Sequence, residues 1–137
     1  MSNLDRYIFM ANFGVSYAQN ILGLIYEEGK EVLQDSKKAL YYYEAAAKQG
    51  LAKAEFNLAL CYKEAKGCQR DYSKAIELFT LAAAQEHNRS FYHLGDIYEK
   101  GLGVEIDIQK ASVFYEKAAK NGYKPAYKKL KLFQEKD

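Results

Sequence analysis

The stretch "HLGDIYEKGLGVEIDIQKASVFYEKAAKNG", residues 93–122, decides the fold because its residue spacing recurs along the chain. Tyr98 in this stretch has counterparts at Tyr62 and Tyr26, in steps of 36 residues. Four further sets keep the same step without a gap: Leu22, Leu58 and Leu94; Asp35, Asp71 and Asp107; Lys38, Lys74 and Lys110; Ala39, Ala75 and Ala111. A fixed period of this length predicts an array of structural repeats.

A direct alignment shows how strong the repeat is. Residues 15–50 and 87–122 are identical at 16 of 36 positions, which composition alone does not produce. The unit between them, residues 51–86, keeps the frame with softer substitutions. It has Ala59 and Glu86 where the other units have Gly, and Phe79 where they have Tyr.

Each unit is predicted to contain two helices. In the first, called helix A here, Ala18, Leu22, Ile25 and Tyr26 recur at helical spacing and share one face. Gly23 lies in the middle of this helix and costs about 1 kcal/mol relative to Ala. We therefore expect another backbone to cross closely at this position and at its counterpart in the third unit, Gly95.

Glycine and aspartate are expected to mark the boundary between the two helices. Gly29 and Gly101 can adopt the left-handed conformation that ends helix A. An apolar connector residue follows, for which Cys68 substitutes in the middle unit. The second helix, helix B, should begin at Asp35 and its equivalents as N-caps. Its buried stripe sets one aromatic residue against paired alanines: Ala39, Tyr43, Ala46, Ala47 and their counterparts.

The overall composition agrees with a folded, all-helical chain. The hydrophobic content is 49%, with one Pro and nine Gly in 137 residues. A formal net charge of +2 argues against a nucleic-acid partner. The N-terminal residues do not resemble a signal peptide, and no apolar run is long enough to span a bilayer. The chain is therefore expected to be cytoplasmic, without membrane insertion.

The pattern from Ser90 to Gly122, L-G-x-x-Y-x-x-G-x-G-V-x-x-D-x-x-K-A-x-x-x-Y-x-K-A-A-x-x-G after the initial small residue, resembles the Sel-one-like repeat (SLR), a branch of the tetratricopeptide-like repeats. The resemblance covers residues 15–122. It implies an all-α fold, a right-handed superhelical solenoid of antiparallel helix pairs. The chain departs from the pattern at Glu31, in a place of Gly, and at Ala65, where Gly would end helix A.

The repeat frame also predicts how the single solenoid domain, residues 1–137, is divided. Residues 15–50, 51–86 and 87–122 form three repeats, residues 1–14 a half repeat, and residues 123–137 a capping helix. Tyr7, Met10 and Ala11 fall on helix B registers, and Ser2 with Asp5 resembles a capping box. The lysine-rich segment near the C-terminus is expected to be a solvated outer face.

Few residues could carry catalysis. The only histidines, His87 and His93, have no partner at metal-ligand spacing, and no nucleophile or phosphate-loop motif occurs. Cys61 and Cys68 are expected to be reduced and apolar, without a disulfide or a metal. No enzyme activity, metal or cofactor is therefore expected. A cysteine-rich bacterial subgroup of the SLR family binds or hydrolyses β-lactams, but its disulfide positions are Ala here.

The candidate binding site is the face of helix A opposite its core stripe. In tetratricopeptide arrays this face lines a concave groove that binds peptides, and the resemblance implies the same here. The predicted groove residues are Tyr17, Asn20, Leu24, Lys53, Phe56, Asn57, Leu60, Arg89, Tyr92, His93 and Asp96. Phe56 and Tyr92 could instead simply pack between neighbouring A helices.

The favoured hypothesis is a monomeric, non-catalytic adaptor that binds a protein or peptide partner in this groove. Within the family the partner could be a bacterial effector or toxin that is neutralised, an envelope or secretion component, or a quality-control client. One alternative is a small-molecule-binding or weakly hydrolytic protein like the β-lactam-binding subgroup. Another is a structural module that associates with itself.

Overall fold

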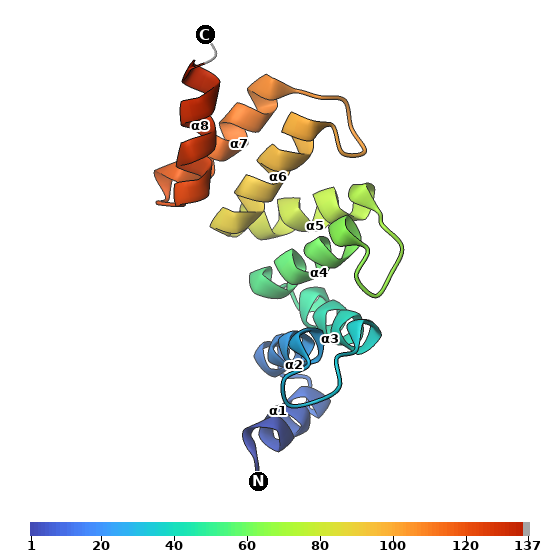
Figure 1. Cartoon of the computed structure of the whole chain (residues 1–137). Coiled ribbons are helices and arrows are strands. Elements are labelled where there is room, and N and C mark those ends of the chain that lie inside the picture. The colour runs from blue at the N-terminus through green and yellow to red at the C-terminus, as the bar shows by residue number, and fades with distance from the viewer. Residues whose placement is uncertain (136–137) are drawn as a thin grey trace. The chain divides into compact units, whose positions relative to one another are not determined.

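The computed structural model describes residues 1–135, which form helices joined by turns and contain no strand (Figure 1). The predicted capping element, residues 123–137, ends in two residues that lie outside the described part. The helices are α1 (Asn3–Asn12), α2 (Ser16–Glu28), α3 (Ser36–Lys48), α4 (Ala52–Glu64), α5 (Tyr72–Ala84), α6 (Asn88–Lys100), α7 (Ile108–Lys120) and α8 (Lys124–Glu135).

The helices form two compact units, the first over Met1–Leu78 and the second beginning at Phe79 within α5. In the first unit α1 packs on α2, α2 on α3, and α3 on α4. In the second unit α6 packs on α7, and α7 on α8. Within each unit these helices pack on the next one in sequence, which confirms the predicted all-α class of consecutive helix pairs.

The pair formed by α2 and α3 shows how two such helices are held antiparallel. At one end the Asp35 amide donates to the Tyr26 carbonyl at 2.9 Å. At the other end the Gln49 side-chain amide donates to the side-chain oxygen of Gln19 and to the Gly14 carbonyl, both at 2.9 Å. The two ends of the pair are thus closed by polar contacts, and the apolar stripes meet between them.

The expected N-caps are confirmed. The Asp35 carboxylate accepts from the amides of Lys37 and Lys38, both at 3.1 Å. Asp71 and Asp107 accept in the same way from the third residue of their helices. At the start of the chain Ser2 accepts from the Asp5 amide. Each side chain satisfies amides that have no partner within the helix.

The expected ends of helix A are confirmed as well. Gly29 and Gly101 have φ of 68° and 69°, in the left-handed region. Ala65 ends α4 in the same conformation, with φ of 58°, although it carries a Cβ. The residue that ends α4 therefore has the same backbone conformation as those that end α2 and α6. An alanine adopts this conformation less readily than a glycine.

In the pair of α2 and α3 the core follows most of the predicted stripe, although Ile25, Tyr26 and Ala47 are half-buried rather than buried. Ala18, Leu22, Ala39, Tyr43 and Ala46 are all at most 1% exposed. The glycines in the middle of helix A, however, do not accommodate a crossing backbone. A Cβ on Gly23 would lie 2.4 Å from Cε1 of Tyr43, and a Cβ on Gly95 would lie 2.6 Å from Cε1 of Tyr115. The close neighbour is the aromatic ring of helix B.

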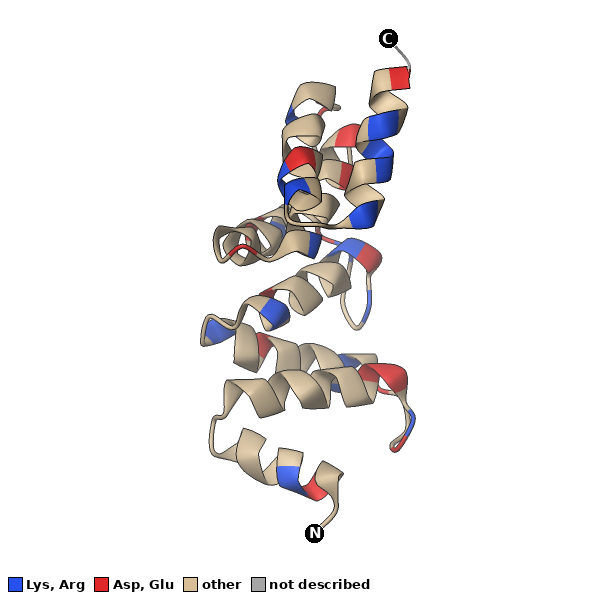
Figure 2. Ribbon diagram, turned by 90° about the vertical axis from the view of Figure 1, so that its left-hand side faces the viewer, with Lys and Arg blue, Asp and Glu red and all other residues tan. Residues whose placement is uncertain are grey.

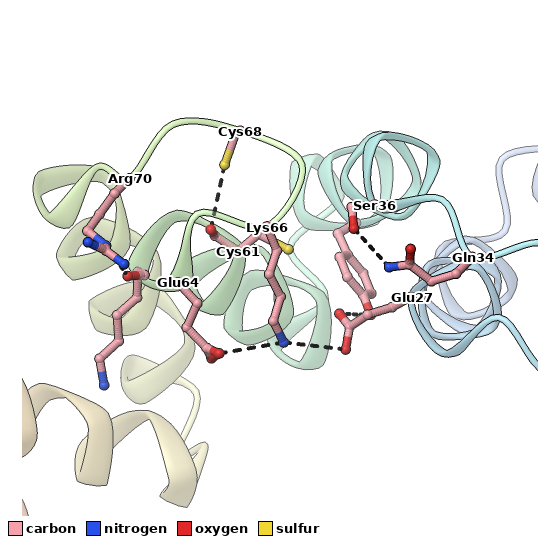
Figure 3. A network of polar contacts seen from close by, with 10 residues as sticks. Glu27, Gln34, Ser36, Cys61, Glu64, Lys66, Cys68 and Arg70 are labelled. Carbon is pink, nitrogen blue, oxygen red and sulfur yellow. Dashed lines mark hydrogen bonds and ion pairs between the residues drawn. The ribbon is translucent and has the colours of Figure 1, made fainter.

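A network of polar contacts fixes the loop after α4 (Figure 3). Lys66 lies between two carboxylates, 3.9 Å from Glu27 of α2 and 3.5 Å from Glu64 of α4. Glu27 also accepts from the hydroxyl of buried Tyr43 at 3.0 Å. In the same loop the Cys68 thiol donates to the Cys61 carbonyl at 3.6 Å, a contact that the valine of the other units does not make.

Candidate functional site

The predicted groove residues of the first compact unit, Met1–Leu78, lie on α2 and α4. They differ widely in exposure. Tyr17 is 54% exposed and Lys53 is also exposed, whereas Asn20 and Phe56 are only 4% and 3% exposed. Leu24, Asn57 and Leu60 are half-buried. Exposed or half-buried side chains on this face can contact a partner without rearrangement of the core.

An amide pair ties the two A helices of this unit together on that face. The side-chain nitrogen of Asn57 donates to the side-chain oxygen of Asn20 at 3.0 Å. Because Asn20 is buried, its oxygen would lose its hydrogen bond if Asn57 were removed. The pair therefore positions α2 and α4, and only the outer part of Asn57 remains accessible.

The predicted groove residues of the second unit make many contacts within that unit. Tyr92 has its ring centroid 5.4 Å from that of Tyr115 and 5.3 Å from that of Tyr123. His93 stacks on Phe79, with centroids 5.2 Å apart and planes at 3°. Both rings are half-buried. Tyr92 thus packs on α7 and on the residue that precedes α8, and His93 packs on α5.

The remaining two candidates of that unit carry charge. Asp96 is 8% exposed and forms an ion pair with Lys100 at 2.9 Å. This hydrogen bond is the main reason that the pKa of Lys100 lies above its ordinary value. Arg89 is exposed on the first turn of α6. Asp96 is thus engaged by a neighbour one turn away, and Arg89 presents its charge at the surface.

A pocket of about 460 Å3 lies on the other side of α4 and was not anticipated from the sequence. Its walls come from α3, α4 and the first half of α5. It is lined by Glu44, Ala47, Lys48, Leu58, Tyr62, Lys74, Glu77 and Leu78. On the helical wheel Leu58 and Tyr62 share one stripe of α4, whereas the groove residue Leu60 lies on the far side. The pocket and the predicted groove are therefore separate surfaces.

The cysteines do not form a reactive site. Cys61 is buried, and burial together with the charge of Glu27 raises the pKa of its thiol to about 12. Burial also raises the pKa of Cys68. The thiol is protonated at neutral pH in both cases, so neither residue is prepared as a nucleophile. Among the described residues, no cluster of three His, Cys, Asp or Glu side chains could hold a metal ion.

The lysine-rich face of α8 is solvated, as expected (Figure 2). Lys124, Lys128 and Lys131 are exposed. Lys129 is half-buried and lies 3.3 Å from Glu99, the carboxylate that accepts the hydroxyl of Tyr115. None of the described helices combines the length and apolar character needed to cross a bilayer.

Comparison with known families identifies the repeat. The Sel1 repeat family matches residues 16–51, 52–87 and 92–123, and the chain belongs to this family. Proteins of this family are typically adaptors for protein interaction, and their fold is generally a non-catalytic scaffold. A search of curated protein sequences finds no match.

Two solved structures show the same fold at clear sequence identity. A Sel1 repeat protein from Oxalobacter formigenes is 32% identical with a TM-score of 0.80, over 88% of this chain. A protective antigen present in uropathogenic Escherichia coli strains, which displays an SLR fold, is 36% identical with a TM-score of 0.83, over 86% of this chain. The alignments span 48% and 25% of those two proteins.

Proposed function

We propose that this chain is a non-catalytic adaptor that binds a protein or peptide partner in the groove formed by the face of its A helices opposite their core stripe. The observation that carries the proposal is the character of that face in the first unit. Tyr17 is more than half exposed, and Leu24 and Leu60, which share one repeat register, are half-buried, with Leu24 also packed against the core cluster of Tyr43 and Leu58. An aromatic residue and apolar side chains that remain accessible at such positions are typical of protein interfaces.

The polar residues of this face would fix the orientation of the partner. Lys53 is exposed and can pair with a carboxylate of the partner. The accessible part of Asn57 can hydrogen-bond to a peptide backbone, as in grooves that hold extended segments. In the second unit Arg89, Tyr92 and His93 are proposed as a further contact surface for such a partner. An effector or toxin that is neutralised, or a component held on a scaffold, fits this role.

The test uses the two exposed residues, because Asn57→Ala would also leave buried Asn20 without its hydrogen bond. The double variant Tyr17→Ser with Lys53→Glu is compared with the wild-type chain for partner capture from an extract of the native cell, followed by mass spectrometry. We expect the captured partner to be lost while the thermal melting temperature stays the same. Unchanged capture by a folded double variant would contradict the proposed face.

A matched control keeps the charge change but moves it off the face. Lys37 is exposed in the first turn of α3, where a glutamate is compatible with the helix dipole. Lys37→Glu should therefore capture the partner as well as the wild type does. Loss of capture in this control as well would indicate a non-specific electrostatic effect.

A further inference from the structure

One contact occurs in all three repeats. A tyrosine near the end of helix A lies under a lysine from the first turn of helix B. The lysine nitrogens lie 5.1, 5.1 and 4.5 Å from the ring centroids of Tyr26, Tyr62 and Tyr98. The lysine interacts with one face of each ring. The residue of helix B that contacts the rest of the ring differs among the three repeats.

In the first and third repeats a second ring from helix B stacks on this tyrosine. Tyr42 stacks on Tyr26 with centroids 5.8 Å apart and planes at 9°. Phe114 stacks on Tyr98 with centroids 5.9 Å apart and planes at 20°. In the middle repeat the same position is occupied by Leu78, which has no ring to stack. The preceding register also changes, from Tyr41 in the first repeat, whose ring meets Tyr42 edge-on at 5.2 Å, to Glu77.

The 460 Å3 pocket lies at this register. Tyr62, Lys74, Glu77 and Leu78 all line it, and Leu58 and Ala47 add further apolar surface. Its volume is within the range of roughly 300–1,000 Å3 that is usual for ligand sites. In the first repeat Tyr42 packs against the core cluster that contains Ala11. The corresponding space is therefore filled by a side chain of the chain itself.

The charges around the pocket favour a neutral occupant. The rim carries two carboxylates, Glu44 and Glu77, and two ammonium groups, Lys48 and Lys74, which balance. The Tyr62 hydroxyl already donates to Glu44 at 3.4 Å. An uncharged ring can therefore enter without bringing an unpaired charge into the pocket, whereas a charged side chain would disturb this balance.

We infer that this pocket binds an aromatic side chain of a partner polypeptide, which stacks on Tyr62 as Tyr42 stacks on Tyr26 and Phe114 on Tyr98. The chain itself shows the chemistry of the occupant, because two of its three repeats place an aromatic ring on the equivalent tyrosine. This surface lies on the opposite side of α4 from the proposed groove, so the inference does not depend on the proposed function.

The experiment titrates the isotope-labelled chain with two blocked tripeptides, acetyl-Gly-Phe-Gly-amide and acetyl-Gly-Leu-Gly-amide, and follows amide shifts by NMR. The phenylalanine peptide should cause saturable shifts at the residues that line the pocket, and its ring protons should move upfield over Tyr62. Stacking should make its binding about fivefold tighter than that of the leucine peptide.

Three variants separate the pocket from other effects. Leu78→Phe supplies the ring that the third repeat already has and should abolish binding, and Tyr62→Leu should remove the preference for the aromatic peptide. Leu81→Phe makes the same exchange at an exposed position of the same helix and should bind like the wild type. Circular dichroism melts confirm that each variant is folded.

Several outcomes would overturn the inference. These are no saturable shift up to the solubility limit of the phenylalanine peptide, equal binding of the leucine peptide, or full binding by folded Leu78→Phe. Shifts that map to Tyr17 and Lys53 would instead assign the peptide to the proposed groove. Shifts at the pocket that depend on protein concentration without peptide would show that a second copy fills it, through one of its own exposed rings.

Discussion

The contact between Gly23 and Tyr43 shows how a single residue sets the distance between the helices of a pair. The tyrosine ring lies against the α-carbon of the glycine, and its hydroxyl donates to Glu27 at 3.0 Å. The third unit repeats the arrangement, with Tyr115 donating to Glu99 at 2.6 Å. In the middle unit all three registers change together, to Ala59, Phe79 and Lys63. The glycine, the hydroxyl and the carboxylate therefore act as one set.

A methyl group on Gly23 should destabilise the fold. Gly23→Ala gains about 1 kcal/mol of helix propensity, but the new Cβ would overlap the buried Tyr43 ring, and overpacking typically costs about 1–3 kcal/mol. We expect a net loss in the free energy of unfolding, measured by urea denaturation, and a similar loss for Gly95→Ala. An increase in stability would show that the ring can move aside at no cost.

The buried tyrosines should make the fold sensitive to alkali. Burial, reinforced by the hydrogen bond and charge of a glutamate, raises the pKa of Tyr43 and Tyr115 above the ordinary value of about 10. The folded state then keeps a proton that the unfolded state releases. Their contribution is fully present below pH 10 and falls by about 1.4 kcal/mol per pH unit and tyrosine above it, until the raised pKa is reached.

Tyr43→Phe tests this directly. It should lower stability by about 1 kcal/mol at pH 7, because the bond to Glu27 is lost. Between pH 10 and 11 it should flatten the decline in stability, measured by urea denaturation at each pH. The control Tyr17→Phe, at an exposed ring, should leave the slope unchanged. An identical slope for Tyr43→Phe would contradict the assignment.

At the scale of the helix, the ends are the most regular part of the structure and the part that the sequence predicts best. The Asp N-caps and the left-handed C-terminal residues follow local rules that involve only a few neighbouring residues. The middle repeat satisfies the same geometry with poorer residues. Ala65 and Glu86 have φ of 58° and 63° at registers where the other repeats have Gly.

Replacement of these residues by glycine should stabilise the chain. Ala65→Gly relieves a left-handed conformation that costs a residue with a Cβ roughly 1–2 kcal/mol, although glycine loses more entropy on folding. We expect a net gain of about 0.5–1 kcal/mol in the free energy of unfolding. The control is Ala84→Gly, at an exposed position inside the last turn of α5, which should lose stability. A loss for Ala65→Gly would show that the Ala65 conformation is not strained.

At the scale of the molecule, the 36-residue period predicts the order of the helices and their pairing within each compact unit, because the helices there pack on their neighbours in sequence. Long-range contacts are less accessible from sequence. The helical wheel places Asn20 on an open face, but α4 reaches it through Asn57 and buries it. The wheel considers one helix at a time, so it could not show this. The pocket was missed for a related reason: it results from a difference between repeats, Tyr42, Leu78 and Phe114, and not from a shared residue.

The central repeat should limit the stability of the array. Leu58 is 6% exposed and contributes to the cluster that includes Ala39, Tyr43 and Cys61. Leu58→Ala should cost about 2–5 kcal/mol, and in a short array this loss should extend to the neighbouring helices. Hydrogen exchange should show faster exchange in α3 as well as in α4. The control Leu81→Ala, at an exposed position, should change stability by less than about 0.5 kcal/mol. A loss confined to α4 would argue against coupling between repeats.

The difference at the stacking register has a consequence for engineering. Since the three repeats share one backbone geometry, a pocket that arises from side-chain differences in one repeat can be introduced into another. Tyr41→Glu with Tyr42→Leu would give the first repeat the Glu and Leu that line the pocket of the second, and Phe114→Leu would begin the same change in the third. A repeat array of this kind could thus carry one, two or three pockets for aromatic side chains, and a few substitutions would set their number without a change of fold.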